Sequence, residues 1–252
     1  MKFSRNDYIF KMKTVVIGDI HGGYKALKQL IETANLPLTT QYIFVGDYVD
    51  GWSQSAEVIS YLIDFSEKYN CVFLRGNHDD LLHRYLISGE NNPMWLAQGG
   101  VSSIKSYADI SEEEKQKHIT FFENLMNYYI DSENRLFIHA GFTNQHGPQN
   151  EFYPNLVYWD RTLWEMASAL DTSISKKNER YPKRLRLFNE IFIGHTPVTR
   201  VGYDKPANFA NVWNVDTGAA FKGRISMLDI DSKEIWQSEP VYTLYPNENG
   251  RN

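Results

Sequence analysis

Five short phrases in this sequence combine carboxylate, amide and imidazole side chains, and each follows an apolar run. The phrases are Gly18-Asp19-Ile20-His21-Gly22, Gly46-Asp47-Tyr48-Val49-Asp50-Gly51, Gly76-Asn77-His78-Asp79, His139-Ala140-Gly141 and Gly194-His195-Thr196. These side chains contain no thiolate, so they suit manganese, iron or catalytic zinc better than a structural zinc ion. One such phrase alone is typical of an ordinary polar turn, whereas the joint pattern indicates a metal site.

The spacing within the phrases supports metal binding. Asp19 and His21 are separated by one residue, so on an extended chain both side chains point to the same side and can share an ion. The glycines allow a sharp turn at a strand end and a close approach of the backbone to a bound ion or phosphate. The single cysteine, Cys71, lies in an apolar run and is interpreted as a buried strand residue rather than a nucleophile.

The elements that must position these phrases alternate in the first third of the chain. Apolar runs predict strands over 14–17, 42–45 and 71–74, and helical spacing predicts helices over 24–34 and 56–65. This alternation favours a parallel sheet covered by helices. Ligand sites in such sheets gather outside the carboxyl ends of the strands, so we expect the phrases to converge.

The remainder of the chain is predicted to add helices and a second sheet. A capping box at Ser111 opens a helix that is expected to run to about Tyr129, and 156–170 is expected to be helical. Residues 171–184 are polar and are interpreted as a loop or lid. Short strands are expected in the last third, in a second and largely antiparallel sheet, over 135–139, 191–193, 212–215, 224–230 and 234–237.

The expected architecture is therefore an α/β fold, a four-layer α/β/β/α sandwich of two mixed sheets flanked by helices. Residues 1–11 are interpreted as an N-terminal arm and 12–252 as a single domain. The net charge of −5 and the lack of a basic block argue against nucleic acid as a partner. No apolar stretch approaches the roughly 20 residues of a membrane helix, and no signal sequence is evident, so a cytoplasmic protein without a membrane partner is expected.

The ordered phrases resemble the calcineurin-like metallophosphoesterase superfamily. Within it they are similar to the phosphoprotein phosphatase family, which includes bacterial serine/threonine phosphatases and symmetrical diadenosine tetraphosphatases. The resemblance implies the metallophosphoesterase fold and a cofactor of two divalent metal ions, with manganese expected and iron or zinc as alternatives. It implies that Asp19 and His21 hold the first ion, that Asp47 bridges both, and that the second is completed by Asn77, His139 and His195.

The same resemblance assigns catalytic roles. His78 would be the general acid, oriented by Asp50, and a hydroxide bridging the two ions would attack phosphorus. Arg161 resembles an arginine that binds substrate phosphate in the bacterial branch. The family places another such arginine after its Gly-Asp-Xaa-Val-Asp phrase, but this chain has Gly51 there.

Several alternatives for the function remain at this stage. The main prediction is a metal-dependent phosphoric monoester hydrolase of the serine/threonine protein phosphatase type, acting on a phosphorylated protein or a small phosphate compound. The alternative is a symmetrical dinucleoside polyphosphate hydrolase, and a second alternative is an inactive binding module on the same fold. Asp216 is interpreted either as a partner that orients His195 or as a turn residue. One or more tryptophans could stack on a nucleobase, although most are expected in the core: Trp52, Trp95, Trp159, Trp164, Trp213 and Trp236.

Overall fold

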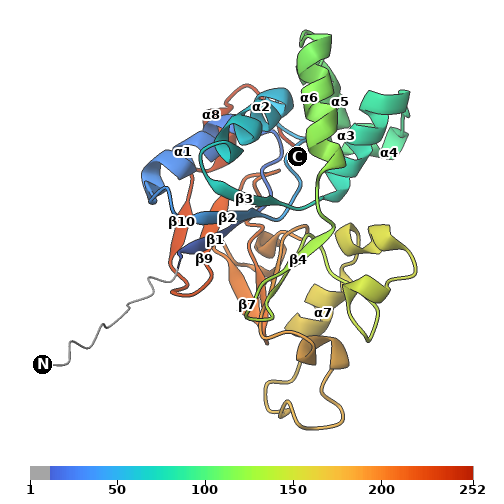
Figure 1. The fold of residues 1–252 in the computed structure, drawn as a ribbon, viewed down its shortest axis with the longest axis vertical. Helices are drawn as coiled ribbons and strands as arrows, with labels where there is room; N and C mark the ends of the chain where they lie inside the picture. Colours follow the sequence, from blue (N-terminus) through green and yellow to red (C-terminus); the bar gives the residue numbers. More distant parts are fainter. Residues whose placement is uncertain (1–11, 252) are drawn as a thin grey trace, which may run out of the picture.

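Two β-sheets pack face to face in a computed structural model of the protein, and helices cover their outer faces (Figure 1). The structure describes residues 12–251, so the N-terminal arm predicted over 1–11 lies outside the described residues. The predicted four-layer sandwich of two mixed sheets is confirmed.

The first sheet has five strands in the order β10-β9-β1-β2-β3. β1 (Thr14–Ile17), β2 (Gln41–Phe44) and β3 (Asn70–Phe73) are parallel, as their alternation with helices predicts. β9 (Ser226–Asp229) pairs antiparallel with β1, and β10 (Ile235–Gln237) pairs antiparallel with β9. All four residues of β1 and of β9 are buried, as is expected of central strands covered on both faces.

The second sheet also has five strands, in the order β4-β5-β6-β8-β7. β5 (Leu136–Ile138), β6 (Ile191–Ile193) and β8 (Val212–Asn214) are parallel. β4 (Tyr128–Ile130) and β7 (Ala207–Phe209) form antiparallel edges. The expectation of a largely antiparallel sheet was therefore wrong, because β9 pairs with β1 and β10 pairs with β9, so both strands join the first sheet.

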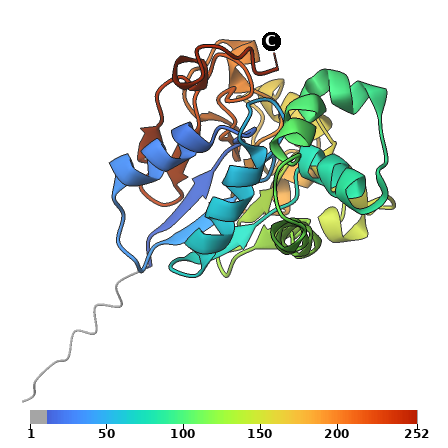
Figure 2. The same ribbon diagram turned by 90° about the horizontal axis from the view of Figure 1, so that it is seen from above.

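The helices lie mainly on the outside of the first sheet, where α1 and α2 run across it when the molecule is seen from above (Figure 2). α7 packs against β7 and β8 of the second sheet. The bounds are α1 Tyr24–Ala34, α2 Ser55–Ser66, α3 Asn77–Ser88, α4 Pro93–Trp95, α5 Val101–Ser106, α6 Glu112–Glu123, α7 Thr162–Ser168 and α8 Val241–Leu244. A π-helical turn over Leu96–Gly100 joins α4 to α5, and short 3-10 turns occur at Pro148–Asn150, Pro154–Tyr158, Lys183–Arg186 and Val198–Val201.

One predicted helix is shorter than expected. Ser111 does cap α6, since its hydroxyl oxygen accepts a hydrogen bond of 3.1 Å from the backbone N–H of Glu114. The helix ends at Glu123, and the apolar residues that seemed to continue it form β4, in which Tyr129 pairs with Phe137. Tertiary pairing overrides the helical spacing at this point.

The space between the sheets is filled by apolar side chains from both. Val16, Ile43 and Leu228 of the first sheet meet Phe137 and Phe192 of the second, and the two phenylalanine rings stack with centroids 4.9 Å apart. Because this layer is fully buried, it fixes the carboxyl ends of β1 and β2 beside those of β5 and β6.

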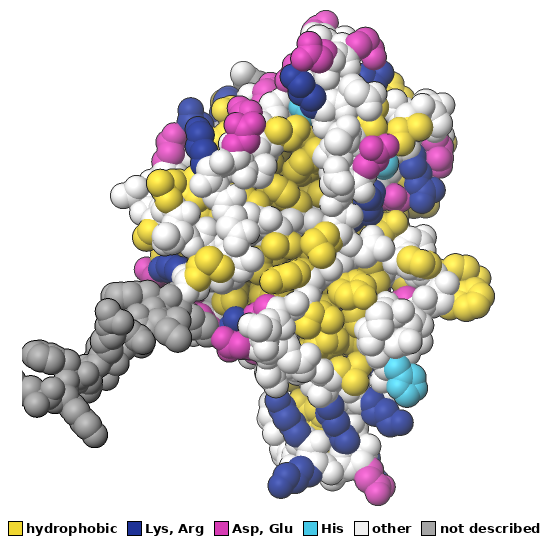
Figure 3. All heavy atoms as spheres, viewed as in Figure 1, with side chains coloured by type: hydrophobic (Ala, Val, Ile, Leu, Met, Phe, Trp, Pro, Cys, Tyr) yellow, Lys and Arg dark blue, Asp and Glu magenta, His cyan; other side chains and the backbone are white. Residues whose placement is uncertain are grey.

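The surface shows two other features on the face drawn in Figure 3. Hydrophobic side chains fill a groove between α2 and α6 that is lined by Ile63, Phe73 and Phe121. Lysine and arginine side chains gather at the end of the molecule below α7. The polar segment 171–184 forms turns, as expected of a loop, and none of its residues lines the pocket described below. No helix in residues 12–251 is long and apolar enough to cross a membrane.

Candidate metal centre

The six predicted metal ligands come from five separate segments and meet at the carboxyl ends of the strands. Asp19 follows β1, Asp47 follows β2, and Asn77 begins α3 just after β3. His139 and His195 follow β5 and β6 of the other sheet. All of these side chains, together with that of His21, are buried. The structure therefore brings together every predicted ligand.

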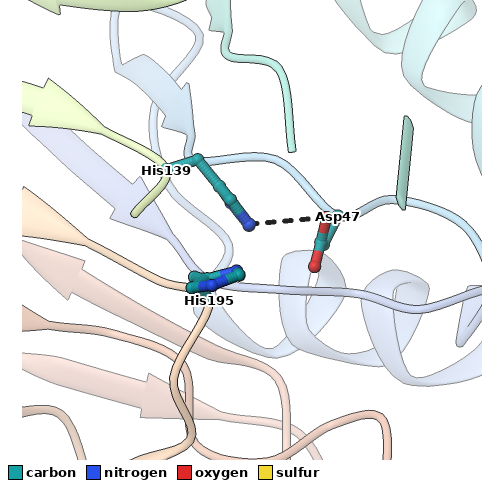
Figure 4. Close-up of side chains that lie close together, drawn as sticks. All are labelled: Asp47, His139 and His195. Carbon is teal, nitrogen blue, oxygen red and sulfur yellow. Dashed lines mark ion pairs between the residues drawn. The ribbon is translucent and has the colours of Figure 1, made fainter. Parts of the chain in front are cut away.

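Asp47 lies at the centre of the cluster. One of its oxygens, Oδ1, is 3.4 Å from His139 Nε2, and the other, Oδ2, is 3.6 Å from His21 Nε2. Asp19 Oδ2 is 3.7 Å from the same His21 nitrogen. Figure 4 shows Asp47, His139 and His195 pointing toward one another. Asp47 thus belongs to two groups of potential ligands, one with Asp19 and His21 and one with His139 and His195.

The hydrogen bonds of the imidazoles leave ring nitrogens available to a cation. His139 Nδ1 donates to the carbonyl of Val45 over 2.8 Å, and His21 Nδ1 donates to that of Asp50 over 2.9 Å. In the neutral form of each ring, Nε2 therefore carries the lone pair that a metal ligand needs. The buried Nε2 atoms of His139 and His195 have no hydrogen-bond partner within residues 12–251. His195 Nδ1 lies 2.9 Å from Asn77 Oδ1, so both side chains reach the same space.

The electrostatics of the cluster point to missing positive charge. Burial raises the pKa of Asp19 to about 7, and the neighbouring charge of Asp47 also raises it. Burial likewise raises the pKa of Asp216 to about 8, with a further contribution from Asp19. Such carboxylates are poorly compensated by the protein, and bound cations would stabilise their ionised forms.

The pKa values of two of the three histidines also fit the binding of cations. Burial lowers the pKa of His21 to about 4 and holds that of His195 well below its ordinary value, so both rings are neutral, as metal ligation requires. His139 differs: burial opposes its charge, but the nearby Asp47 carboxylate outweighs this and raises the pKa of His139 to about 10. The donor set, the orphaned nitrogens and the uncompensated carboxylates together fit a pair of divalent cations.

Four residues of the site share an unusual backbone conformation. His21, Asp47, Asp50 and His195 all have positive φ, between 54° and 69°, a region that non-glycine residues seldom occupy. The expectation that an extended chain would place Asp19 and His21 on one side was therefore wrong in its mechanism. The chain turns at His21, and that turn carries the ring back toward Asp19 and Asp47.

Two glycines leave room for the carboxylates. A Cβ atom on Gly76 would lie 2.1 Å from Asp47 Oδ1, and one on Gly194 would lie 2.2 Å from Asp19 Oδ1. Any side chain at either position would displace the carboxylate beside it.

His78 and Asp50 form a pair next to the cluster. His78 Nδ1 donates to Asp50 Oδ2 over 2.7 Å, and both side chains are buried. Asp50 is also held by Trp95 and Ser103: the indole Nε1–H donates to Oδ2 over 2.5 Å and the hydroxyl donates to Oδ1 over 2.6 Å. From the sequence, Trp95 is only one of six tryptophans that could stack on a nucleobase, and Ser103 has no assigned role. Neither residue belongs to one of the five phrases, so no motif in the sequence marked them.

The pocket above the cluster is lined by three arginines, Arg161, Arg200 and Arg251, together with Trp159 and Phe221. Only Arg161 was predicted. Trp159 is 40% exposed, whereas Trp52, Trp95 and Trp164 are buried core residues.

Asp216 also lines this pocket, and it accepts a hydrogen bond of 2.9 Å from the backbone N–H of Gly218. The ring of His195 is paired with Asn77 instead, so the interpretation of Asp216 as a turn residue describes its contacts better.

Residues 12–219 match the family of calcineurin-like phosphoesterases, and the chain belongs to this family. The predictions of the family, of the fold and of a phosphoesterase activity are thereby confirmed. An inactive binding module is correspondingly disfavoured, since all six predicted ligands lie together and His78 is paired with Asp50.

The chain is similar in sequence to several bacterial proteins named bis(5′-nucleosyl)-tetraphosphatase PrpE, which are described as asymmetrical. The protein of Bacillus anthracis (strain CDC 684 / NRRL 3495) is 30% identical over 235 residues, which cover 86% of this chain and 90% of that protein. The protein of Anoxybacillus flavithermus (strain DSM 21510 / WK1) is 27% identical over 228 residues, covering 84% of this chain and 88% of that protein.

Similar folds occur among solved structures. A protein provisionally described as a diadenosine tetraphosphatase superposes with a TM-score of 0.59 at 16% identity, covering 91% of this chain and 94% of that one. A protein serine/threonine phosphatase from Saccharomyces cerevisiae with similarity to human phosphatase PP5 gives 0.56 at 17% identity, covering 93% and 82%. At these identities the likeness establishes the fold alone.

Proposed function

We propose that this protein hydrolyses a phosphoanhydride bond of bis(5′-nucleosyl) polyphosphates, and that it does so asymmetrically. The observation that carries the proposal is the arginine-rich pocket over the metal cluster. Arg161, Arg200 and Arg251 line it, and none of them is ion-paired with a carboxylate in the described part of the chain. Three unpaired guanidinium groups suit a chain of several phosphates better than a single phosphoryl group.

The metal-binding residues follow from the geometry of the cluster. We assign Asp19, His21 and Asp47 to one divalent cation and Asp47, Asn77, His139 and His195 to the other, with manganese as the expected ion. When bound, the two cations supply Lewis-acid polarisation of the phosphoryl group and lower the pKa of a coordinated water. Asp47 has one oxygen beside His139 and the other beside His21, so its carboxylate would take part in holding both cations.

The remaining residues bind the substrate and move a proton. His78 lines the pocket and holds its Nδ1 proton against Asp50, so Nε2 is the atom that would deliver a proton to the departing phosphate oxygen. Asp50 orients the ring through this hydrogen bond. Arg161, which lines the pocket, would hold phosphate oxygens, and Trp159, which lines the same pocket and is partly exposed, suits a nucleobase.

The prediction of a phosphoprotein substrate has less support. Its structural argument is the likeness to the yeast serine/threonine phosphatase, which concerns the fold. The relatives of higher identity carry the tetraphosphatase name, which agrees with the alternative made from the sequence except that it specifies asymmetrical cleavage.

The test is product analysis with manganese present. Asymmetrical hydrolysis of diadenosine tetraphosphate yields one ATP and one AMP for each water consumed, whereas symmetrical hydrolysis yields two ADP. We expect ATP and AMP, and a turnover at least ten times that on a phosphoserine peptide. Exclusive formation of ADP would refute the asymmetrical assignment, and hydrolysis of the phosphopeptide alone would refute the substrate class.

A matched variant tests the proposed acid. His78→Asn retains a polar side chain beside Asp50 and keeps the backbone N–H that donates to Asp47 Oδ1 over 3.0 Å. Residue 78 belongs to neither group of metal ligands, so we expect manganese content to stay near that of the parent. Turnover should fall about 100-fold or more, which is the usual contribution of a positioned general acid. A variant that turns over as fast as the parent would exclude His78 from proton transfer.

A further inference from the structure

The segment that follows α8 brings a charged side chain into the metal-site pocket from the far end of the described chain. Three contacts dock this segment. The ring of Tyr245 stacks on Trp52 with centroids 5.3 Å apart, and the Glu248 carboxylate accepts hydrogen bonds of 2.9 and 2.7 Å from the backbone N–H and hydroxyl of Ser53. The backbone N–H of Arg251 then donates to the carbonyl of Ala220 over 2.9 Å.

The side chain of Arg251 occupies space that two glycines leave open. A Cβ atom on Gly51 would lie 3.4 Å from Arg251 Cγ, and one on Gly99 would lie 3.2 Å from the same atom. Both glycines have φ above +100°, which a larger residue would adopt only with strain. Residue 51 directly follows the Asp47–Asp50 loop, so the stem of Arg251 runs beside the loop that carries the central metal ligand.

The charged end of Arg251 has no anionic partner among the described residues. Its Nε atom is buried and lacks a hydrogen-bond partner among residues 12–251, and its guanidinium carbon lies 5.6 Å from the ring centroid of Phe221. Arg251, Phe221, His21 and Asp47 line the same pocket. A buried donor without a partner is unfavourable, and an oxyanion in the pocket would satisfy it.

The neighbouring arginine charges also favour the binding of an anion in this pocket. Loss of solvent lowers the pKa of Arg161, and the charges of Arg200 and Arg251 lower it further, so the three groups repel one another in the free protein. A polyanionic ligand converts this repulsion into attraction, whereas a structural role for Arg251 would call for a nearby carboxylate.

We propose that Arg251 is a phosphate-binding residue of this pocket, delivered by the segment after α8 into the space above Gly51. The identity of the bound phosphate as part of a dinucleoside polyphosphate rests on the proposed function, whereas the binding of a phosphate group by Arg251 does not. An arginine missing from the Asp47–Asp50 loop is in this way supplied from a distant part of the chain.

The experiment compares Arg251→Ala and Arg251→Lys with Arg180→Ala, which removes the same charge from the polar loop outside the pocket. Binding of inorganic phosphate to the manganese-loaded proteins is measured by calorimetry, and KM for diadenosine tetraphosphate by steady-state hydrolysis. We expect Arg251→Ala to raise both the phosphate Kd and the KM about tenfold or more, as loss of a charge-assisted pair does. For Arg251→Lys, the phosphate Kd and the KM should lie between those of the parent and the alanine variant. Lysine keeps the positive charge but lacks the planar guanidinium group that can donate two hydrogen bonds to one phosphate.

The outcomes separate the two proposals. A phosphate Kd for Arg251→Ala within twofold of the parent, with or without a lower Tm, would give the arginine a structural role only and overturn this inference. A parent that leaves diadenosine tetraphosphate intact would refute the proposed substrate, while the phosphate titration would still decide the role of Arg251. An equal loss of phosphate affinity in Arg180→Ala would show a general charge effect and would also overturn the inference.

Discussion

Trp95→Phe tests whether the buried indole positions the His78–Asp50 pair. Trp95 is 1% exposed, and its Nε1–H donates to Asp50 Oδ2, the same oxygen that accepts from His78 Nδ1. Phenylalanine fills most of the same volume but cannot donate. The substitution therefore removes one hydrogen bond to a buried carboxylate and leaves the bond from Ser103 in place.

The magnitude follows from the nature of the lost bond. Hydrogen bonds to charged groups contribute about 1.5–3 kcal/mol, and the smaller ring adds a cavity cost of roughly 1 kcal/mol. For a chain of this length the Tm should fall by roughly 5–16 °C, at about 2–4 °C per kcal/mol. If about 1.4 kcal/mol of the loss appears as poorer positioning of His78, kcat falls about tenfold. KM should stay near the parent value, because Trp95 does not line the pocket.

The assay pairs thermal unfolding with steady-state kinetics at saturating manganese. Trp164→Phe is the matched control, because Trp164 is also buried at 3% exposure and packs on Phe209 beside the second sheet, away from Asp50. Trp164→Phe should lose only the stability that the smaller ring costs through the cavity it leaves, and its kcat should stay at the parent value. If Trp95→Phe loses no more stability than the control and keeps the parent kcat, then the indole does not position Asp50 and the reasoning fails.

Two further predictions concern the metal cluster and a buried histidine remote from it. Asp47→Asn should lose bound manganese and turnover together, because Asp47 contributes an oxygen to both ligand groups, and elemental analysis showing two ions per chain would contradict its central position. His118 is 1% exposed and contacts Ser60 and Tyr107, and burial lowers its pKa to about 4. Since the unfolded chain binds this proton near pH 6.5, the neutral ring stabilises the fold above that pH by roughly 3 kcal/mol, and the contribution is lost as the pH falls toward 4. His118→Gln should therefore flatten the fall of Tm between pH 6.5 and 4, and a curve parallel to that of the parent would refute the assignment.

Much of the fold could be predicted because it is encoded locally. The run Thr14–Ile17 and the helical spacing of Tyr24–Ala34 define elements whose observed bounds agree with the prediction. The phrases that contain Asp19, Asp47 and Asn77 follow their strands directly, so the general rule for strand ends was enough to bring them together.

The parts that were missed depend on contacts between distant segments. Whether Ser226–Asp229 joins the first or the second sheet is decided by its pairing with β1, and hydrophobic pattern alone does not distinguish these partners. The hydrogen bond from Trp95 to Asp50 and the position of Arg251 over Gly51 also depend on contacts between segments that are distant in the sequence. In each case one residue has no motif of its own, and its role arises from the packing of its segment.

The loop from Gly46 to Gly51 explains why these distant contacts meet at one place. Asp47 and Asp50 both have positive φ, a conformation that costs on the order of 1–3 kcal/mol for each residue. The carboxylate of Asp79 offsets part of this cost, since it accepts backbone N–H bonds of 2.8 Å from Asp47, 2.9 Å from Tyr48 and 2.8 Å from Gly76.

The Asn77-His78-Asp79 phrase therefore contributes a proposed ligand, a proposed acid and the residue that holds the opposing loop in its strained shape. Because the loop is fixed from outside, its own side chains remain free for chemistry: Asp47 faces the rings of His21 and His139, and Asp50 faces His78. At Gly51 the loop offers no side chain at all, and the open space admits Arg251. The glycine that removes an expected arginine from this loop is thus the same feature that lets another arginine enter.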